Sequence, residues 1–160
     1  MIEVARDVFV GNQHDAEYGW KKNDDWAFIY CCKEPWHRAM VGYTGQGCPK
    51  DSPHYLYIIQ DNALALNMVD VENPDFFAVG MISMAIGFAW NFNNRKLLFS
   101  CNQGESRSPS VAMLYLAVVE SIPNGTFEEA EEAFKKLYPY YKPKNGIREH
   151  LKRNWGMYTL

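Results

Sequence analysis

The feature that most constrains the fold is the stretch LLFSCNQGESRSPSVAMLYL, residues 97–116. A short apolar block is followed by a run of mostly small or polar residues, and a second apolar block with helical spacing comes next. This order predicts a buried strand, a short loop and a helix in direct succession. The chain must therefore build its core around a strand-loop-helix unit whose loop lies at the end of a buried strand.

Length and charge narrow the class of protein. A chain of 160 residues with 48% hydrophobic content can bury a core, so we expect a single domain over residues 1–160. The 15% aromatic content and the net charge of −3 argue against disorder and provide no general reason to expect a nucleic-acid partner. The opening MIEVARDVFV does not resemble a secretory signal, and the most apolar stretch, 76–90, is shorter than the roughly 20 residues of a membrane span. We expect a cytoplasmic protein without a membrane span.

The four cysteines are expected to be free thiols. They show no paired CxxC spacing, and a chain of this size without an export signal does not need a disulfide frame. Neighbouring residues on a strand face opposite sides of the sheet, so one of Cys31 and Cys32 is expected in the core. Cys48 lies in a long loop that allows exposure, and Cys101 lies in the loop of the strand-loop-helix unit.

Hydrophobic period and turn residues divide the chain into alternating strand and helix candidates. The segment 34–53 carries three glycines and three prolines without sustained periodicity, which suggests a functional loop or lid. Strands mixed with helices around one sheet indicate an α/β domain. Strands are predicted over 4–10, 26–32, 55–59, 63–69 and 96–100, and helices over about 74–92, 109–122 and 146–155, with one more that begins at Thr126 and uses Glu129 in a capping box.

The loop between the buried strand and its helix has the composition of an anion site. Backbone N–H groups gather at a helix N-terminus, and Gly104 can take a positive φ, so the loop can curl around a bound group. The guanidinium fork of Arg107 matches the oxygens of a phosphate, and Cys101 would then lie beneath the phosphorus. Amide dipoles, the helix N-terminus and the guanidinium all favour the thiolate form. We therefore expect Cys101 to be a nucleophile at neutral pH.

The sequence SCNQGESRSPS resembles the signature loop Cys-x5-Arg-Ser/Thr of the cysteine-dependent protein tyrosine phosphatases. The likeness is strongest to the dual-specificity branch, whose motif usually reads His-Cys-x-x-Gly-x-Ser-Arg-Ser. The segments VFVGNQHDAEY and YYKPKNGIREHLKRNW are similar to the opening and closing segments of that family. The resemblance implies a central mixed, mainly parallel sheet flanked by helices. The matching positions are Cys101, Gly104, Ser106, Arg107 and Ser108.

The resemblance also implies a set of catalytic and binding residues. Members of the family use an aspartate about thirty residues before the cysteine as general acid, and Asp70 lies in that position. Asp75 is the alternative, although the dipole of a helix that begins there explains its carboxylate. Ser108 is implied to hydrogen-bond the thiolate, and no metal or cofactor is implied. The implied phosphate-binding residues are Asn102, Gln103, Gly104, Glu105, Ser106 and Arg107.

The resemblance implies a hydrolase that removes phosphate from phosphotyrosine, with phosphoserine and phosphothreonine as further candidates, through a phosphocysteine intermediate. The expected partner is a phosphorylated protein or peptide. One departure from the motif is Ser100, which stands where the family usually has histidine. A serine hydroxyl can replace part of the hydrogen bonding of an imidazolium but not its charge, so a weaker nucleophile or a higher pH optimum is expected. A catalytically weak or inactive pseudophosphatase that binds phosphorylated partners is therefore an alternative.

Charged residues outside the loop leave further alternatives open. One group is either a cationic rim that selects substrates or a set of solvated side chains: His37, Arg38, Lys50 and His54. The C-terminal third is segregated by charge, with acidic residues over 128–132 followed by a basic run over 135–153. Such runs are usually exposed helix faces. A basic surface beside a phosphate site would also suit an RNA 5′-phosphate or a phosphoinositide as substrate.

Overall fold

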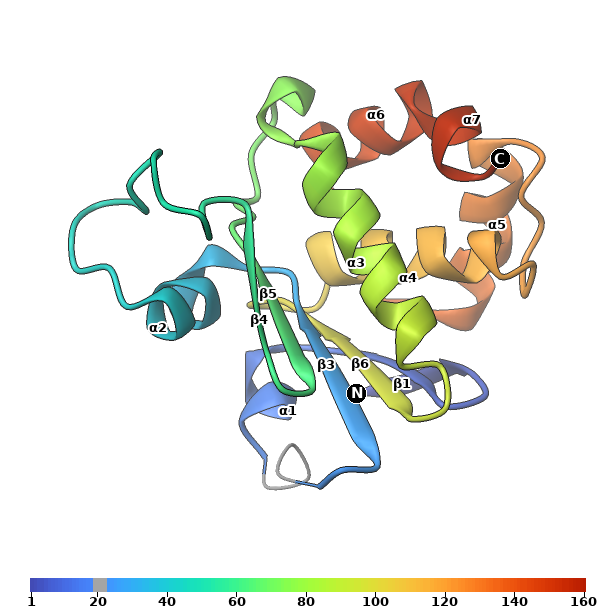
Figure 1. Cartoon of the computed structure of the whole chain (residues 1–160). Coiled ribbons are helices and arrows are strands. Elements are labelled where there is room, and N and C mark those ends of the chain that lie inside the picture. Colours follow the sequence, from blue (N-terminus) through green and yellow to red (C-terminus); the bar gives the residue numbers. More distant parts are fainter. Residues whose placement is uncertain (19–22) are drawn as a thin grey trace.

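The computed structural model describes residues 1–18 and 23–160, and Figure 1 shows the arrangement of the elements. The described strands form one sheet in the order β1-β2-β6-β3-β5-β4. The strands are β1 (Ile2–Ala5), β2 (Val8–Gly11), β3 (Trp26–Tyr30), β4 (Tyr57–Gln60), β5 (Ala63–Leu66) and β6 (Lys96–Ser100). The helices and helical turns are α1 (Gln13–Glu17), η2 (Lys33–His37), α2 (Arg38–Val41), η3 (Pro74–Phe76), α3 (Val79–Asn91), α4 (Arg107–Val118), α5 (Phe127–Leu137), α6 (Asn145–Arg153) and α7 (Trp155–Tyr158).

The inner part of the sheet is parallel, and each edge is an antiparallel hairpin. Strand β6 pairs in parallel with β2 on one side and with β3 on the other, and β3 pairs in parallel with β5. The edge strands β1 and β4 pair antiparallel with β2 and β5. This confirms the predicted mixed, mainly parallel sheet. The carboxyl ends of parallel strands meet at one edge of a sheet, which is where α/β proteins place their sites.

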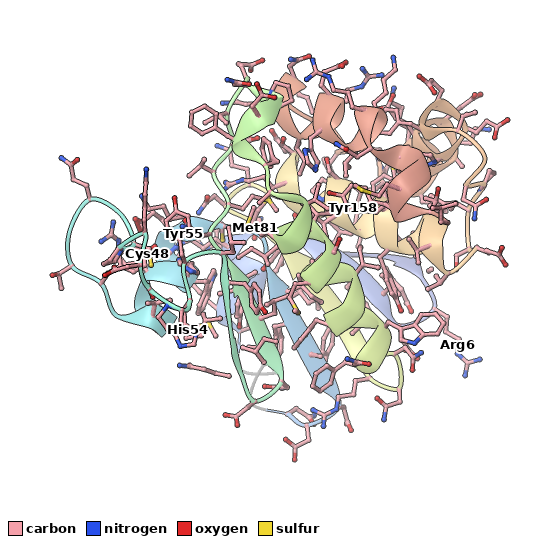
Figure 2. All side chains as sticks on the ribbon, turned by 45° about the horizontal axis from the view of Figure 1, so that its top comes forward. Arg6, Cys48, His54, Tyr55, Met81 and Tyr158 are labelled. Atoms are coloured by element: carbon pink, nitrogen blue, oxygen red, sulfur yellow. The ribbon has the colours of Figure 1, made fainter. Side chains whose placement is uncertain are left out.

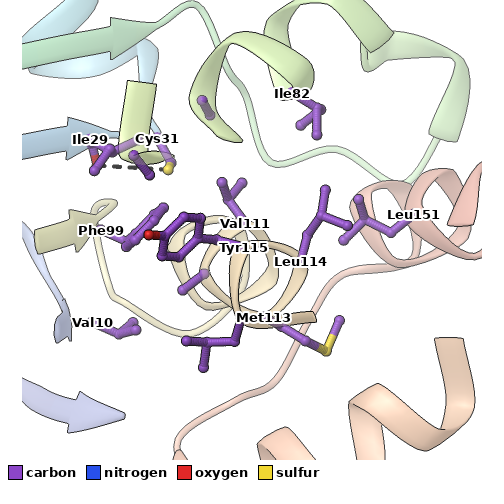
Figure 3. Packing of buried hydrophobic residues seen from close by; sticks show 14 of the residues in the cluster. Val10, Ile29, Cys31, Ile82, Phe99, Val111, Met113, Leu114, Tyr115 and Leu151 are labelled. Carbon is purple, nitrogen blue, oxygen red and sulfur yellow. Dashed lines mark hydrogen bonds between the residues drawn. The ribbon is translucent and has the colours of Figure 1, made fainter. Parts of the chain in front are cut away.

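Side chains alternate along β3 and so supply two hydrophobic cores, one on each face of the sheet. Trp26, Phe28 and Tyr30 belong to a smaller cluster with residues of α1 and α2. Ala27 and Ile29 face the larger cluster, which lies under α3, α4, α5 and α6. Helix α4 crosses this larger core, as Figure 3 shows for its buried side chains beside strand β6. The helix after the cysteine loop is therefore fixed in place by packing on several sides.

Several predicted elements differ from the structure at their ends. The strand expected over 4–10 is a hairpin, because the chain turns at Asp7, whose φ is 60°. The helix expected over 74–92 is interrupted, because Phe77 and Ala78 are extended between η3 and α3. Phe77 is buried with its ring 6.0 Å from that of His150 in α6. Docking of this side chain under α6 explains the interruption.

Helix α4 begins two residues before the predicted start at Pro109. A proline in the first helical turn is tolerated because its missing N–H would have no partner there. The helix also ends earlier than predicted, close to Glu120, whose φ is 61°. Thr126 is confirmed as the N-cap of α5, since it accepts a hydrogen bond of 3.1 Å from the Glu129 N–H, but the return bond of the predicted capping box, from the Thr126 N–H to the Glu129 side chain, is not observed in the described structure. The hairpin of β4 and β5 and the central strand β6 also agree with their predicted positions.

The segment 34–53 contains η2, α2 and a loop whose backbone oxygens accept hydrogen bonds from charged side chains. Arg38 donates hydrogen bonds to backbone oxygens of the loop, including Gly45, and Lys33 donates to the Gln46 oxygen at 2.8 Å. Cys48 is buried within this loop, so the exposure allowed by the sequence is not observed. One of Cys31 and Cys32 was expected in the core, and the structure buries both of them fully, beyond the end of β3 at Tyr30. All four cysteines are free thiols, as predicted.

Candidate active site

The loop between β6 and α4 curls at the carboxyl end of the central strand. Cys101 directly follows β6, and Ser106 is the N-cap residue of α4. Gly104 has a φ of 73°, and a Cβ at this position would lie 2.8 Å from the backbone oxygen of Gly11. The curl of the loop therefore requires glycine here for two independent reasons. The Gly104 oxygen in turn accepts a 2.6 Å hydrogen bond from the hydroxyl of Tyr138.

Cys101 lines a cavity of about 600 Å³. The side chain is 3% exposed, and Sγ accepts a hydrogen bond of 3.2 Å from the Ser108 hydroxyl. Ser108 lies behind the sulfur within α4, and its Oγ is also 3.3 Å from the Gly11 oxygen. The structure thus brings the predicted nucleophile and the predicted serine into direct contact.

Arg107 is buried, lines the cavity and has one nitrogen without a hydrogen-bond partner in the described residues. Its Nη1 donates to the Met68 oxygen at 2.9 Å, and its Nη2 donates to Asn102 Oδ1 at 2.6 Å. Its Nε is buried and has no hydrogen-bond partner in the described part of the chain. A buried donor without a partner is costly, so an acceptor atom bound at Nε would relieve this cost.

Asn102 links the loop to two distant segments. Its Nδ2 donates to the backbone oxygen of Glu34 at 2.8 Å and to Gln13 Oε1 at 3.1 Å. These two contacts fix the Asn102 side chain, and its Oδ1 accepts the hydrogen bond from Arg107 Nη2. The motif marks Asn102 only as a variable position, so sequence reasoning identified its backbone role and missed its role in orienting the arginine.

Asp70 lies on the opposite wall of the cavity, in the irregular segment after β5. Its Oδ1 accepts a 3.0 Å hydrogen bond from the Ser106 hydroxyl at the end of the cysteine loop. Asp75 lies elsewhere: its side chain is 83% exposed, and its nearest ion-pair partner is Arg153 at 3.9 Å. Asp70 therefore lines the same cavity as Cys101 and Arg107, and Asp75 does not.

The remaining cavity wall comes from the chain before and at the start of α6. Lys142 and Lys144 line the cavity there, together with Asn145 and, from the Asp70 segment, Glu72. The Lys142 N–H donates a hydrogen bond of 2.7 Å to the Glu105 oxygen, which joins this wall to the cysteine loop. From the sequence these lysines were part of a long charged run, and nothing in the run separated them from the exposed cations. Of the predicted phosphate-binding residues, the cavity lining includes Asn102, Gln103, Glu105, Ser106 and Arg107, whereas Gly104 lies behind it.

The predicted cationic rim of His37, Arg38, Lys50 and His54 does not border this cavity in the described structure. His37 is fully buried, with Nδ1 2.9 Å from the Tyr43 hydroxyl and Nε2 2.8 Å from the His54 oxygen, and burial lowers its pKa. Arg38 is paired with Glu34. Figure 2 shows His54 beside Cys48 and Tyr55 in the loop that precedes β4. Only Lys50 and His54 are exposed, and both lie in that loop.

Ser100 and the buried cysteines complete the surroundings of the nucleophile. Ser100 Oγ is buried and has no hydrogen-bond partner in the described residues, so the partial replacement of histidine hydrogen bonding expected from the sequence is not observed. Burial is the main cause that raises the pKa of Cys32 to about 12, and burial also raises the pKa of Cys31 well above its ordinary value. Both thiols are therefore neutral at physiological pH.

No group of three or more histidine, cysteine, aspartate or glutamate side chains is placed to hold a metal ion within residues 1–18 and 23–160. Within the same residues, no helix has both the length and the apolar character that crossing a membrane requires.

A central parallel strand that runs through a cysteine loop into a buried helix is the arrangement of the dual-specificity branch of the cysteine-dependent protein tyrosine phosphatases, and this chain has that fold. Among similar solved structures, DUSP15 is 20% identical, with 97% of this chain and 86% of that chain covered and a TM-score of 0.67. The human tyrosine phosphatase-like serine/threonine/tyrosine-interacting protein is 16% identical, with 99% and 97% covered and a TM-score of 0.67. Human DUSP28 is 16% identical, with 99% and 95% covered and a TM-score of 0.61. No family model and no curated protein matches the sequence.

Proposed function

We propose that this protein is a cysteine-dependent phosphatase that hydrolyses phosphomonoesters on proteins, with phosphotyrosine as the first substrate to test and phosphoserine and phosphothreonine next. One observation supports this most strongly. Cys101, Arg107 and Asp70 line a single cavity, and Arg107 Nε has no hydrogen-bond partner in the described residues. A nucleophile, an anion-binding donor and a proton donor are the three groups that phosphoryl transfer without a metal requires.

In the first step, the Cys101 thiolate attacks phosphorus, and an S–P bond forms as the ester P–O bond breaks. Arg107 and the backbone amides of residues 102–107 hold the phosphoryl oxygens, so the developing charge meets fixed dipoles. Asp70 gives its proton to the departing oxygen, and the alcohol or phenol leaves as a neutral molecule. The covalent product is a phosphocysteine.

In the second step, water attacks the phosphorus of the phosphocysteine. The Asp70 carboxylate takes a proton from this water, and the S–P bond breaks to release inorganic phosphate. The Ser108 hydroxyl, 3.2 Å from the sulfur, stabilises the thiolate as it leaves. The enzyme then returns to its starting state.

The decisive experiment is hydrolysis of an aryl phosphate in the presence of excess chelator. We expect turnover that orthovanadate blocks and that Cys101→Ser reduces to background. Turnover that survives in Cys101→Ser would refute the proposal, because no other cysteine lines the cavity in the described structure. The chelator separates this mechanism from hydrolysis by a contaminating metalloenzyme.

The role of Asp70 has its own test. We expect Asp70→Asn to lower kcat on a phosphotyrosine peptide about 100-fold, since general acid catalysis contributes about 10²–10⁴-fold. Vanadate binding should be retained, because the loop amides and Arg107 are unchanged. Asp75→Asn is the matched control, and a loss in that variant equal to the loss in Asp70→Asn would move the role to Asp75.

A second candidate function is recognition of phosphorylated partners without hydrolysis. Ser100 favours it, because the usual histidine is absent and the serine hydroxyl makes no hydrogen bond in the described structure. The retained Cys101 and Arg107 oppose it, since a binding protein has no need of a nucleophile. Saturable binding of a phosphopeptide by the wild-type protein, with no turnover between pH 5 and 9 and no selective alkylation of Cys101, would establish this candidate instead.

A further inference from the structure

The first turn of α6 is packed against the segment that carries Asp70. Lys144 Nζ donates to the Asp70 backbone oxygen at 3.3 Å, and Asn145 Nδ2 donates to the Glu72 oxygen at 3.2 Å. These contacts join positions more than 70 residues apart in the sequence. The Asp70 segment has no helix or strand of its own between β5 and η3, so its backbone depends on neighbours for a fixed position.

Gly146 makes this contact close. A Cβ added at Gly146 would overlap the backbone oxygen of Val71, and it would also lie 2.9 Å from Cε2 of Phe77. The absence of a side chain at the start of α6 therefore lets the Asp70 segment lie directly against the helix. The obstacle to a larger residue is a backbone atom, which cannot turn aside as the end of a flexible side chain can.

Ser106 connects this contact to the cysteine loop. Its buried hydroxyl oxygen accepts a hydrogen bond of 2.9 Å from the Lys144 N–H and donates one of 3.0 Å to Asp70 Oδ1. The Ser106 oxygen accepts the hydrogen bond from the Lys144 N–H, so the hydroxyl proton points away from that N–H and is donated to the Asp70 carboxyl group. One carboxyl oxygen is thus held, and Oδ2, which has no hydrogen bond in the described structure, is left to carry the transferred proton.

We propose that the first turn of α6, residues 144–146, together with the Ser106 hydroxyl, is a clamp that positions Asp70 for proton transfer. This inference rests on the proposed phosphatase function and assigns Ser106, Lys144, Asn145 and Gly146 as positioning residues. The contacts of the clamp are present without substrate, so the carboxyl group is held before substrate binds. A displacement of about 1 Å in a catalytic group can cost on the order of 100-fold in rate, so a fixed carboxyl position is valuable.

The test compares two substrates that differ in their need for an acid. The phenol of phosphotyrosine has a pKa of about 10 and requires a proton as it leaves, whereas a dinitrophenolate departs without one. We expect Gly146→Ala, Asn145→Ala and Ser106→Ala each to lower kcat on a phosphotyrosine peptide by about 10-fold or more. Gly146→Ala and Asn145→Ala should hydrolyse dinitrophenyl phosphate at close to the wild-type kcat and keep their affinity for vanadate.

Three comparisons make the outcome decisive. Asp70→Asn must show the same selective loss of kcat on the phosphotyrosine peptide, and the loss must be larger. If the wild-type protein hydrolyses neither substrate, the proposed function fails rather than the clamp. Thr126→Ala is the matched control, because it removes a serine-like hydroxyl that caps a different helix. If Gly146→Ala does not fold, Asn145→Ala and Lys144→Met decide. Equal losses on both substrates, or no loss, in these variants would overturn the clamp.

Discussion

Replacing Gly104 by alanine should distort the cysteine loop and destabilise the whole protein. An L-residue at a φ of 73° costs about 1–2 kcal/mol. The new Cβ would lie 2.8 Å from the Gly11 oxygen and 3.2 Å from the Asn12 nitrogen, and both are backbone atoms in well-packed structure. Overpacking of this kind typically costs about 1–3 kcal/mol more. We therefore expect a loss of about 3 kcal/mol in the free energy of unfolding.

The assay is thermal unfolding combined with vanadate binding. In a domain of this size a loss of 1 kcal/mol lowers Tm by about 2–4 °C, so Gly104→Ala should unfold roughly 10 °C below the wild type. Vanadate affinity should fall as well, because the amides of the loop can no longer converge on one point. Orthovanadate should then raise the Tm of Gly104→Ala less than it raises that of the wild type.

Gly87→Ala provides the matched control. Gly87 is exposed within α3, and a Cβ there would meet no atom within 4 Å. Alanine in a helix interior is favoured over glycine by about 1 kcal/mol, so this variant should be slightly more stable than the wild type. If Gly104→Ala has the Tm and the vanadate affinity of the wild type, the reasoning about loop geometry is wrong.

Further predictions concern a buried ion pair and the cysteines. Glu131→Gln should reduce the free energy of unfolding by about 2 kcal/mol, because Glu131 accepts two charge-assisted hydrogen bonds of 2.9 Å from Arg148. Burial raises the pKa of Glu131, but the hydrogen bonds and charge of Arg148 outweigh it, so the folded-state pKa is lowered. The stability due to this carboxylate is present above its unfolded pKa of about 4.3 and is lost as the pH falls through the folded-state value. Chemical unfolding measured across that range should show a flatter acid limb in Glu131→Gln than in the wild type, and identical limbs would contradict the assignment. Iodoacetate at neutral pH should alkylate Cys101 first in the native protein, whereas Cys31 and Cys32 should react only after unfolding, as peptide mass mapping can test.

The parts of the fold that the sequence predicted are those specified by nearby residues. The run from β6 into the cysteine loop is contiguous, so its apolar period, its glycine and its arginine could be placed without knowledge of any partner segment. The hairpin of β4 and β5 was predicted for the same reason. The interruption of the helix at Phe77 could not be predicted, because it results from packing of that side chain under α6, more than 60 residues away along the chain.

The candidate site shows the same division. Cys101, Arg107 and Ser108 are close in sequence, and their types alone predicted a thiol, a guanidinium and a hydroxyl at one loop. The choice between Asp70 and Asp75 depended on the path of the chain between two elements, which sequence spacing alone could not settle. The burial of His37 and Cys48 within the segment 34–53 could not be predicted either, because that segment has no regular hydrophobic period from which burial could be inferred.

The sequence by itself determined the alternation of strands and helices and the identity of the loop that can bind an anion, because both depend on short-range period and backbone geometry. Only the tertiary structure decided which carboxyl group lines the cavity with Cys101, which nitrogen of Arg107 has no partner in the described residues, and which helix contacts the Asp70 segment. These depend on contacts between segments far apart in the chain, such as Gly146 with Val71 and Asn102 with Glu34. Hydrogen bonding and close packing fix such contacts only once the whole core has formed.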